Sequence, residues 1–172
     1  MTNKIVNKVA QSGIITLDLE DWIKDEQFIG IDLKDQLWQG LALKEKDFRA
    51  WVKEHDWSQY ENQHVFVFCS ADAIVPVWAF MLVTSKLNPH TKSVTHGNEE
   101  DARRSFFEAH FHNLDTAAFD DARMVIKGCG DGLVPSSVYT MAVSKLQPLV
   151  KSLMFGEPCS TVPVYKKPRI KA

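Results

Sequence analysis

The chain has 172 residues, of which 45% are hydrophobic and 24% charged, and its formal net charge is -2. This is the composition of a globular protein with a real core, and so small a charge gives no reason to expect a nucleic-acid partner. No apolar run is long enough to span a bilayer, and the N-terminus lacks the apolar segment of a signal peptide. We therefore expect a cytoplasmic protein with reduced thiols and no membrane association, built as a single domain over residues 1–172.

The N-terminal third, residues 1–57, predicts an irregular part of the domain with antiparallel strands. A strand is expected at 13–18, and the runs at 28–33 and 37–43 are expected to pair with each other as a hairpin. The apolar spacing over 44–55 predicts an amphipathic helix.

From residue 58 to residue 163, short apolar runs alternate with helical patterns. The alternation indicates βαβ units, and hence an α/β fold with a parallel-dominated sheet and flanking helices. No internal repeat is evident, and the basic residues 164–172 are expected to form an extended tail. The predicted strands are 65–68, 93–96, 124–126 and 153–155, and the predicted helices are 76–87, 99–114 and 135–150, two of which begin with proline.

Three cysteines occupy similar places along this part of the chain. Cys69, Cys129 and Cys159 each follow an apolar run, and each is followed within a few residues by a Val-Pro pair. If the three runs are strands of one parallel sheet, the thiols meet at the edge where open α/β folds bind their ligands. Thiolates bind zinc, iron and iron–sulfur clusters. The alternative is that each cysteine is a small apolar filler, and no Cys-x-x-Cys pair decides between the two.

Two carboxylates lie in the same loops as the thiols. Asp72 comes three residues after Cys69, and Asp131 comes two residues after Cys129. We expect one of these aspartates as a further metal ligand in preference to His96, whose strand carries no cysteine. The alternative for Asp72 is an N-cap of the helix that follows.

Five strings of the chain carry a resemblance to a known family. They are the segments 13–21 (GIITLDLED), 46–49 (KDFR), 69–76 (CSADAIVP), 127–131 (KGCGD) and 156–163 (GEPCSTVP). Together they resemble an uncharacterised family of bacterial proteins, chiefly from the Bacteroidetes, catalogued as the domain of unknown function DUF2480. The resemblance implies no activity, but it implies an encoding near SUF-type iron–sulfur assembly proteins.

These observations give one leading hypothesis and two alternatives. The leading hypothesis is a three-cysteine site, Cys69, Cys129 and Cys159 with Asp72 or Asp131, that handles zinc, iron or an iron–sulfur cluster. With the resemblance, it predicts an accessory to iron–sulfur cluster assembly, with assembly proteins as partners. The alternatives are a thiol-dependent enzyme with a cysteine nucleophile and an interaction module with purely structural cysteines.

Overall fold

A computed structural model of the chain describes residues 13–128, 132–157 and 160–168. The chain divides into two compact units, and the sequence of one interrupts the sequence of the other. Glu26–Phe106 forms the inserted unit, and Met1–Asp25 with Phe107–Ala172 forms the outer unit. The division falls within the helix α4 (Glu99–Asn113).

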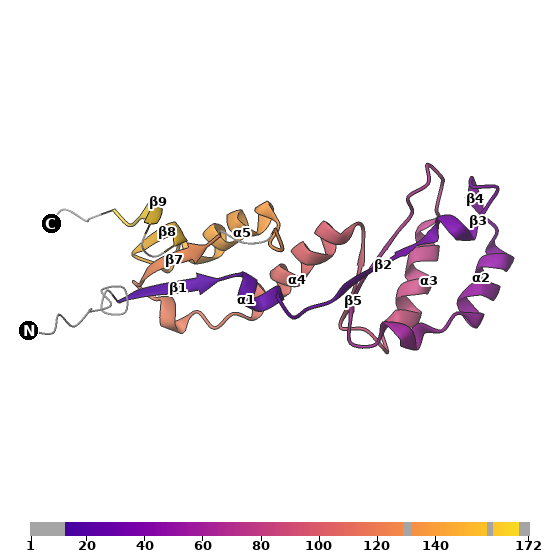
Figure 1. Cartoon of the computed structure of the whole chain (residues 1–172), viewed down its shortest axis with the longest axis horizontal. Helices are drawn as coiled ribbons and strands as arrows, with labels where there is room; N and C mark the ends of the chain where they lie inside the picture. Colours follow the sequence, from indigo (N-terminus) through magenta and orange to yellow (C-terminus); the bar gives the residue numbers. More distant parts are fainter. Residues whose placement is uncertain (1–12, 129–131, 158–159, 169–172) are drawn as a thin grey trace, which may run out of the picture. The chain divides into compact units, whose positions relative to one another are not determined.

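The inserted unit is built on a three-stranded parallel sheet in the order β2-β5-β6, of which β2 and β5 are labelled in Figure 1. Strand β5 lies in the middle, and its alternate residues Val65 and Val67 are buried. The elements of this unit are β2 (Phe28–Asp32), η1 (Leu33–Gln36), β3 (Leu37–Trp38), β4 (Ala42–Leu43), α2 (Glu45–Glu54), η2 (Trp57–Tyr60), β5 (His64–Phe68), α3 (Val77–Leu87) and β6 (Ser93–His96).

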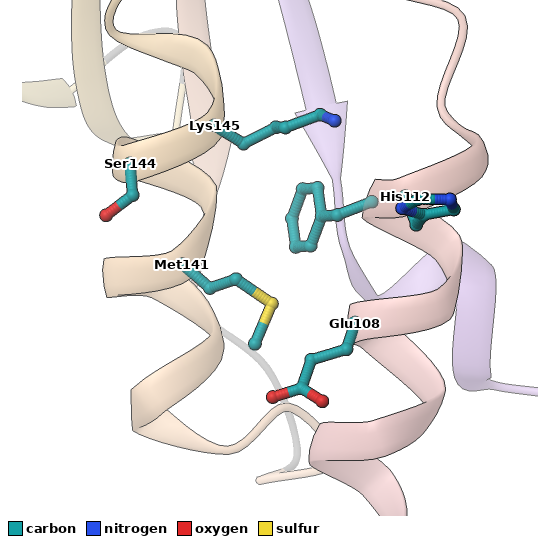
Figure 2. Close-up of a pocket in the computed structure, with 6 residues that line it drawn as sticks. Glu108, His112, Met141, Ser144 and Lys145 are labelled. Carbon is teal, nitrogen blue, oxygen red and sulfur yellow. The ribbon is translucent and has the colours of Figure 1, made fainter.

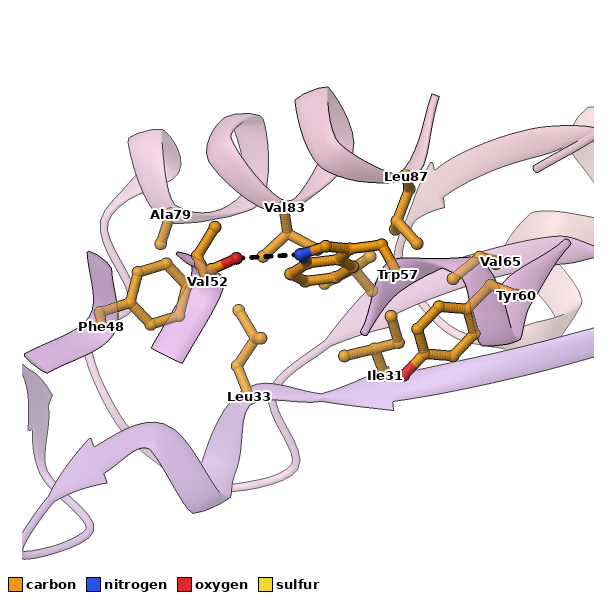
Figure 3. Packing of buried hydrophobic residues seen from close by; sticks show 11 residues of the cluster. Ile31, Leu33, Phe48, Val52, Trp57, Tyr60, Val65, Ala79, Val83 and Leu87 are labelled. Carbon is orange, nitrogen blue, oxygen red and sulfur yellow. Dashed lines mark hydrogen bonds between the residues drawn. The ribbon is translucent and has the colours of Figure 1, made fainter. Parts of the chain in front are cut away.

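Residues spaced four apart on helices α2 and α3 supply much of this unit's core. Phe48 and Val52 come from α2, and Trp57, just after that helix, donates its indole Nε1–H to the Val52 carbonyl at 2.9 Å (Figure 3). The i, i+4 spacing places such residues on one helix face, which is then buried against the sheet. The remaining members of the cluster are Ile31, Leu33, Tyr60, Val65, Val67, Ala79, Val83 and Leu87.

The outer unit is built on a four-stranded sheet in the order β1-β7-β8-β9. The first three strands run parallel, and β9 lies antiparallel to β8. The elements of this unit besides its part of α4 are β1 (Ile14–Asp18), α1 (Glu20–Ile23), η3 (Ala117–Phe119), β7 (Arg123–Lys127), α5 (Ser136–Leu146), β8 (Ser152–Glu157) and β9 (Ser160–Lys166).

The two units repeat the same arrangement of strands and helix. Residues 64–96 correspond to residues 123–155 without insertion or deletion, so that β5, α3 and β6 match β7, α5 and β8. The first strand of each sheet also matches: β2 pairs with β5 in the register in which β1 pairs with β7. Six of nine residues are identical between Ser85–Ser93 and Ser144–Ser152.

Burial and backbone bonding follow the same correspondence. The fully buried residues of α3 match those of α5 position by position. The amide of Asn62 donates to His90 O, and the matching amide of Asp121 donates to Leu149 O; both donors have positive φ, at 61° and 50°. The chain therefore contains one βαβ unit twice, and the prediction of no internal repeat is wrong. The matched buried positions are Ala79 with Val138, Val83 with Ala142, and Leu87 with Leu146.

The fold class predicted from the sequence is confirmed: a parallel-dominated α/β fold with flanking helices and an antiparallel pair, β3 with β4, in the N-terminal third. The expected pairing of 28–33 with 37–43 is wrong, because β2 instead pairs in parallel with β5. The expected single sheet is also wrong, because β5 and β7 belong to different sheets. Residues 164–166 belong to β9 and not to an extended tail. The single-domain organisation stays a prediction.

Candidate functional site

Two of the five predicted metal ligands, Cys69 and Asp72, lie among the residues that the structure describes. Cys129, Asp131 and Cys159 lie outside the described residues. The strands that precede Cys129 and Cys159 in the sequence, β7 and β8, are described. In both units the relevant place is the edge at which the parallel strands end.

At this edge of the inserted unit, Cys69 directly follows β5. The thiol is half-buried, and its Sγ lies 3.7 Å from the carbonyl oxygen of Ala71, to which it donates a weak hydrogen bond. The next residue, Ser70, donates from Oγ to the carboxylate of Asp32 at 2.5 Å and from its amide at 3.0 Å. Asp32 ends the neighbouring strand β2, so a serine–carboxylate contact ties the two strand ends together.

Electrostatics at Asp32 reflect this contact. Burial raises the pKa of the carboxyl group, but hydrogen bonds from Ser70 Oγ and from the amides of Ser70 and Lys34 outweigh it and hold the pKa below its ordinary value. Asp32 is therefore ionised and occupied as an acceptor. Sequence reasoning missed it, and its signal in the sequence is a carboxylate inside the apolar run 28–33, which was expected as a strand.

The other two candidates in the inserted unit are Asp72 and His96. Asp72 is exposed. His96, at the end of β6, is exposed and packs its ring against Phe80, with the ring centroids 4.1 Å apart. Neither side chain has a described contact with Cys69.

At the matching edge of the outer unit, three charged side chains meet at the ends of three strands. Lys127, the last residue of β7, donates from Nζ to Asp18 of β1 at 2.6 Å, and its Nζ lies 4.0 Å from Glu157 Oε1 of β8. The hydrogen bond from Lys127 to Asp18 raises the pKa of the lysine, which is fully charged at neutral pH. Lys127 stands two residues before Cys129 in the sequence, and Glu157 stands two residues before Cys159.

Gly128 shows how closely the chain is packed at this point. A Cβ at Gly128 would collide with the ring of Phe155 on β8, so no larger residue fits without moving that ring. Gly128, the residue directly after β7, thus lies against the ring of Phe155 on the neighbouring strand. This close approach accounts for the glycine before Cys129.

The premise for bringing the three thiols together does not hold as stated, because β5 leads to Cys69 in one sheet while β7 and β8 lead towards Cys129 and Cys159 in the other. The runs before Cys129 and Cys159 do end side by side on neighbouring parallel strands. Within the described residues, no group of three or more histidine, cysteine, aspartate or glutamate side chains is placed to hold a metal ion.

A separate hollow of about 400 Å³ lies between α4 and α5 of the outer unit (Figure 2). In Figure 2 the thioether of Met141 reaches into it, with Glu108 and His112 on the α4 side. Ser144 and Lys145 line its α5 side, but Ser85 and Lys86 occupy the matching positions of α3. Those two residue types therefore belong to the repeat, and they do not distinguish this hollow as a site.

The fold and the two strand-end edges define an α/β protein made of two copies of one parallel βαβ unit, with a cysteine or a cysteine-bearing segment after the central strand of each. The sequence matches the family described as "Protein of unknown function (DUF2480)" over residues 3–167, and the chain belongs to that family. No curated protein and no solved structure matches the chain. None of the described helices has the length and apolar character needed to cross a membrane.

Proposed function

We propose that the protein handles a zinc or iron ion, or an iron–sulfur cluster, through the thiols of Cys129 and Cys159 at the strand-end edge of the outer unit. One observation supports the proposal: the strands that precede these cysteines, β7 and β8, are parallel neighbours. At the ends of these strands, Lys127 Nζ lies 4.0 Å from Glu157 Oε1. Two thiolates and a carboxylate are a ligand set suited to zinc or iron.

The ligand set of the proposal is Cys129, Cys159 and Asp131. Lys127, charged and two residues before Cys129 in the sequence, would favour the thiolate form that metal binding requires. A site with three protein ligands keeps one position open for exchange, as an accessory to cluster assembly in the cytoplasm would need. Cys69 and Asp72 belong to the inserted unit, and their part in the site stays a prediction.

The test is metal content and zinc affinity of the full chain purified without added metal. Cys129→Ser and Cys159→Ser are expected to lose stoichiometric metal, Asp131→Ala to weaken binding, and Cys69→Ser, the matched control, to keep it. Equal loss of bound metal in all three cysteine variants would contradict the two-thiol site and support the site of three thiols.

The remaining outcomes separate the alternative classes. A metal-free protein with one unusually reactive thiol supports a thiol-dependent enzyme, because only a thiolate of lowered pKa reacts fast with an electrophile. Three inert thiols support an interaction module. Iron–sulfur assembly proteins remain the proposed partners, and co-purification with them from the native host tests that expectation.

A further inference from the structure

The two copies of the βαβ unit differ at one sheet edge. In the outer unit, β9 covers the outer side of β8 as an antiparallel strand. In the inserted unit, β6 corresponds to β8, but within the described residues its only strand partner is β5. An uncovered strand edge presents backbone donors and acceptors to which another extended chain can pair.

The backbone of β6 is oriented for such pairing. The amide of Gly97, directly after β6, donates to Val67 O of β5 at 3.1 Å. Successive residues of a strand alternate in the side to which their N–H and C=O groups point. Thr95, two residues before Gly97, therefore also faces β5, and the N–H and C=O of Val94 point away from β5.

In the outer unit, β9 is the strand added to the edge of β8, and one of its side chains packs into a hollow beside that edge. Val164 of β9 closes an apolar hollow whose other walls come from α5, β7 and β8. The aromatic floor of this hollow is a Tyr139–Phe155 pair with ring centroids 5.4 Å apart. The full lining is Ile126, Tyr139, Thr140, Val143, Met154, Phe155 and Val164.

The matching place in the inserted unit has the same aromatic floor and a more apolar wall. Phe80 and His96 form the counterpart of the Tyr139–Phe155 pair. Met81 stands where the outer unit has Thr140, and it is 67% exposed. On the same side of α3, Val77 is exposed where α5 has Ser136. The repeated fold does not require apolar residues at these two positions, so their exposure points to an occupant.

We propose that the outer edge of β6 binds an extended segment of a partner protein, which adds antiparallel to β6 and sets an apolar side chain against Phe80 and Met81. The occupant is chosen by analogy with β9, which does the same at the matching edge of the outer unit. Main-chain hydrogen bonds supply affinity in this mode, and the side-chain hollow supplies selectivity. The site contains no cysteine and is independent of the proposed metal function.

The probe is a labelled synthetic peptide with the sequence of Ser160–Lys166, the strand that fills the matching edge. Saturable binding to the full chain, followed by fluorescence anisotropy, is expected. Val94→Pro removes the outward N–H while leaving the pairing with β5, and it is expected to weaken binding by about tenfold or more. Val94→Ala keeps the amide and serves as the matched control.

A further variant of the chain and a variant peptide keep the test valid if circular dichroism shows that Val94→Pro does not fold. Met81→Thr gives the inserted unit the residue of the outer unit and is expected to weaken binding severalfold. A peptide with Val164→Asp is expected to bind the wild-type chain poorly, because its anchor is then charged.

Three results would overturn the proposal. The first is a lack of saturable binding to the wild-type chain. The second is equal affinity for wild type, Val94→Pro and Met81→Thr, which would mean that the peptide exchanges with β9 of the outer unit. The third is a wild-type dimer that becomes monomeric in Val94→Pro, because the occupant would then be a second copy of this chain.

Discussion

Single side chains carry identifiable parts of the stability of the inserted unit. Trp57 is almost fully buried, and its indole N–H is paired with a carbonyl in the last turn of α2. A buried hydrogen bond whose partner is left behind costs more than one that is removed whole. This pairing depends on how the chain turns between α2 and η2, which no local sequence pattern predicts.

Trp57→Phe is expected to lower the free energy of unfolding by about 1–3 kcal/mol, because the Val52 carbonyl loses its buried partner. Urea unfolding followed by circular dichroism measures the change. Trp38→Phe in the same unit is the control, since Trp38 is 48% exposed and its replacement is expected to cost less than about 0.5 kcal/mol. Equal effects in the two variants would show that the hydrogen bond adds nothing.

Glu26 gives the inserted unit a pH-dependent contact. Its carboxylate accepts a hydrogen bond from Lys92 at 2.6 Å and lies 3.1 Å from His64 Nε2. The hydrogen bond from Lys92 is the largest influence and lowers the pKa of Glu26 below its ordinary value of 4.5. Because the folded pKa lies below the unfolded one, the ionised carboxylate stabilises the fold above the unfolded pKa, and this stabilisation disappears as pH falls through the folded pKa.

Glu26→Gln is therefore expected to destabilise the protein at neutral pH, by about 1 kcal/mol or less for so exposed a pair, and to have a smaller effect below the folded pKa. Unfolding free energies of wild type and variant across the acid range test this, with the exposed Glu54→Gln as control. A difference that stays constant from neutral to acid pH would contradict the assignment.

At the scale of elements, local sequence patterns predicted which helices form but not which strands pair with each other. The helix expected at 76–87 is found at Val77–Leu87, and the one expected at 44–55 is found at Glu45–Glu54. Helix signals lie within the helix itself, in its apolar spacing and its ends. A strand's partner can be distant in sequence, and β2 pairs with β5 rather than with the run that follows it. The expected hairpin failed for this reason.

The equivalence of α3 and α5 has a measurable consequence. Leu87→Ala and Leu146→Ala remove matching, fully buried side chains, and each is expected to cost about 2–5 kcal/mol through lost burial and a residual cavity. Ser85→Ala and Ser144→Ala, on the exposed faces of the same helices, are expected to stay within about 0.5 kcal/mol. A leucine variant as mild as its serine control would show that its helix does not pack as its counterpart does.

At the scale of the molecule, the nested order of the two copies explains why the repeat escaped the sequence. The first strands, β1 and β2, are close together in the chain, while the matching segments 64–96 and 123–155 are far apart. A single sequence shift therefore cannot align both parts. Only the short stretch from Ser85 to Ser93 is strongly alike in its counterpart, and hydrophobic positions elsewhere match in kind rather than in identity.

The same architecture assigns the three cysteine-bearing runs to two sheets. The sequence correctly predicted that Cys69 directly follows a buried parallel strand, β5, and the places of Cys129 and Cys159 stay a prediction. It could not show that the chain builds two sheets, which separates β5 from β7 and β8. Our proposal is therefore narrowed from three thiols to the pair Cys129 and Cys159, because the runs that precede them are neighbouring strands of one sheet.

X-ray absorption fine structure at the zinc edge of the zinc-loaded full chain tests this claim most directly, because it counts the sulfur ligands of the bound ion. The account predicts two sulfur ligands at about 2.3 Å, with oxygen or nitrogen completing the shell. Cys69→Ser is expected to leave the count unchanged, and Cys159→Ser to remove one sulfur. A shell of three sulfurs that loses one in Cys69→Ser, or a shell without sulfur, would contradict the account.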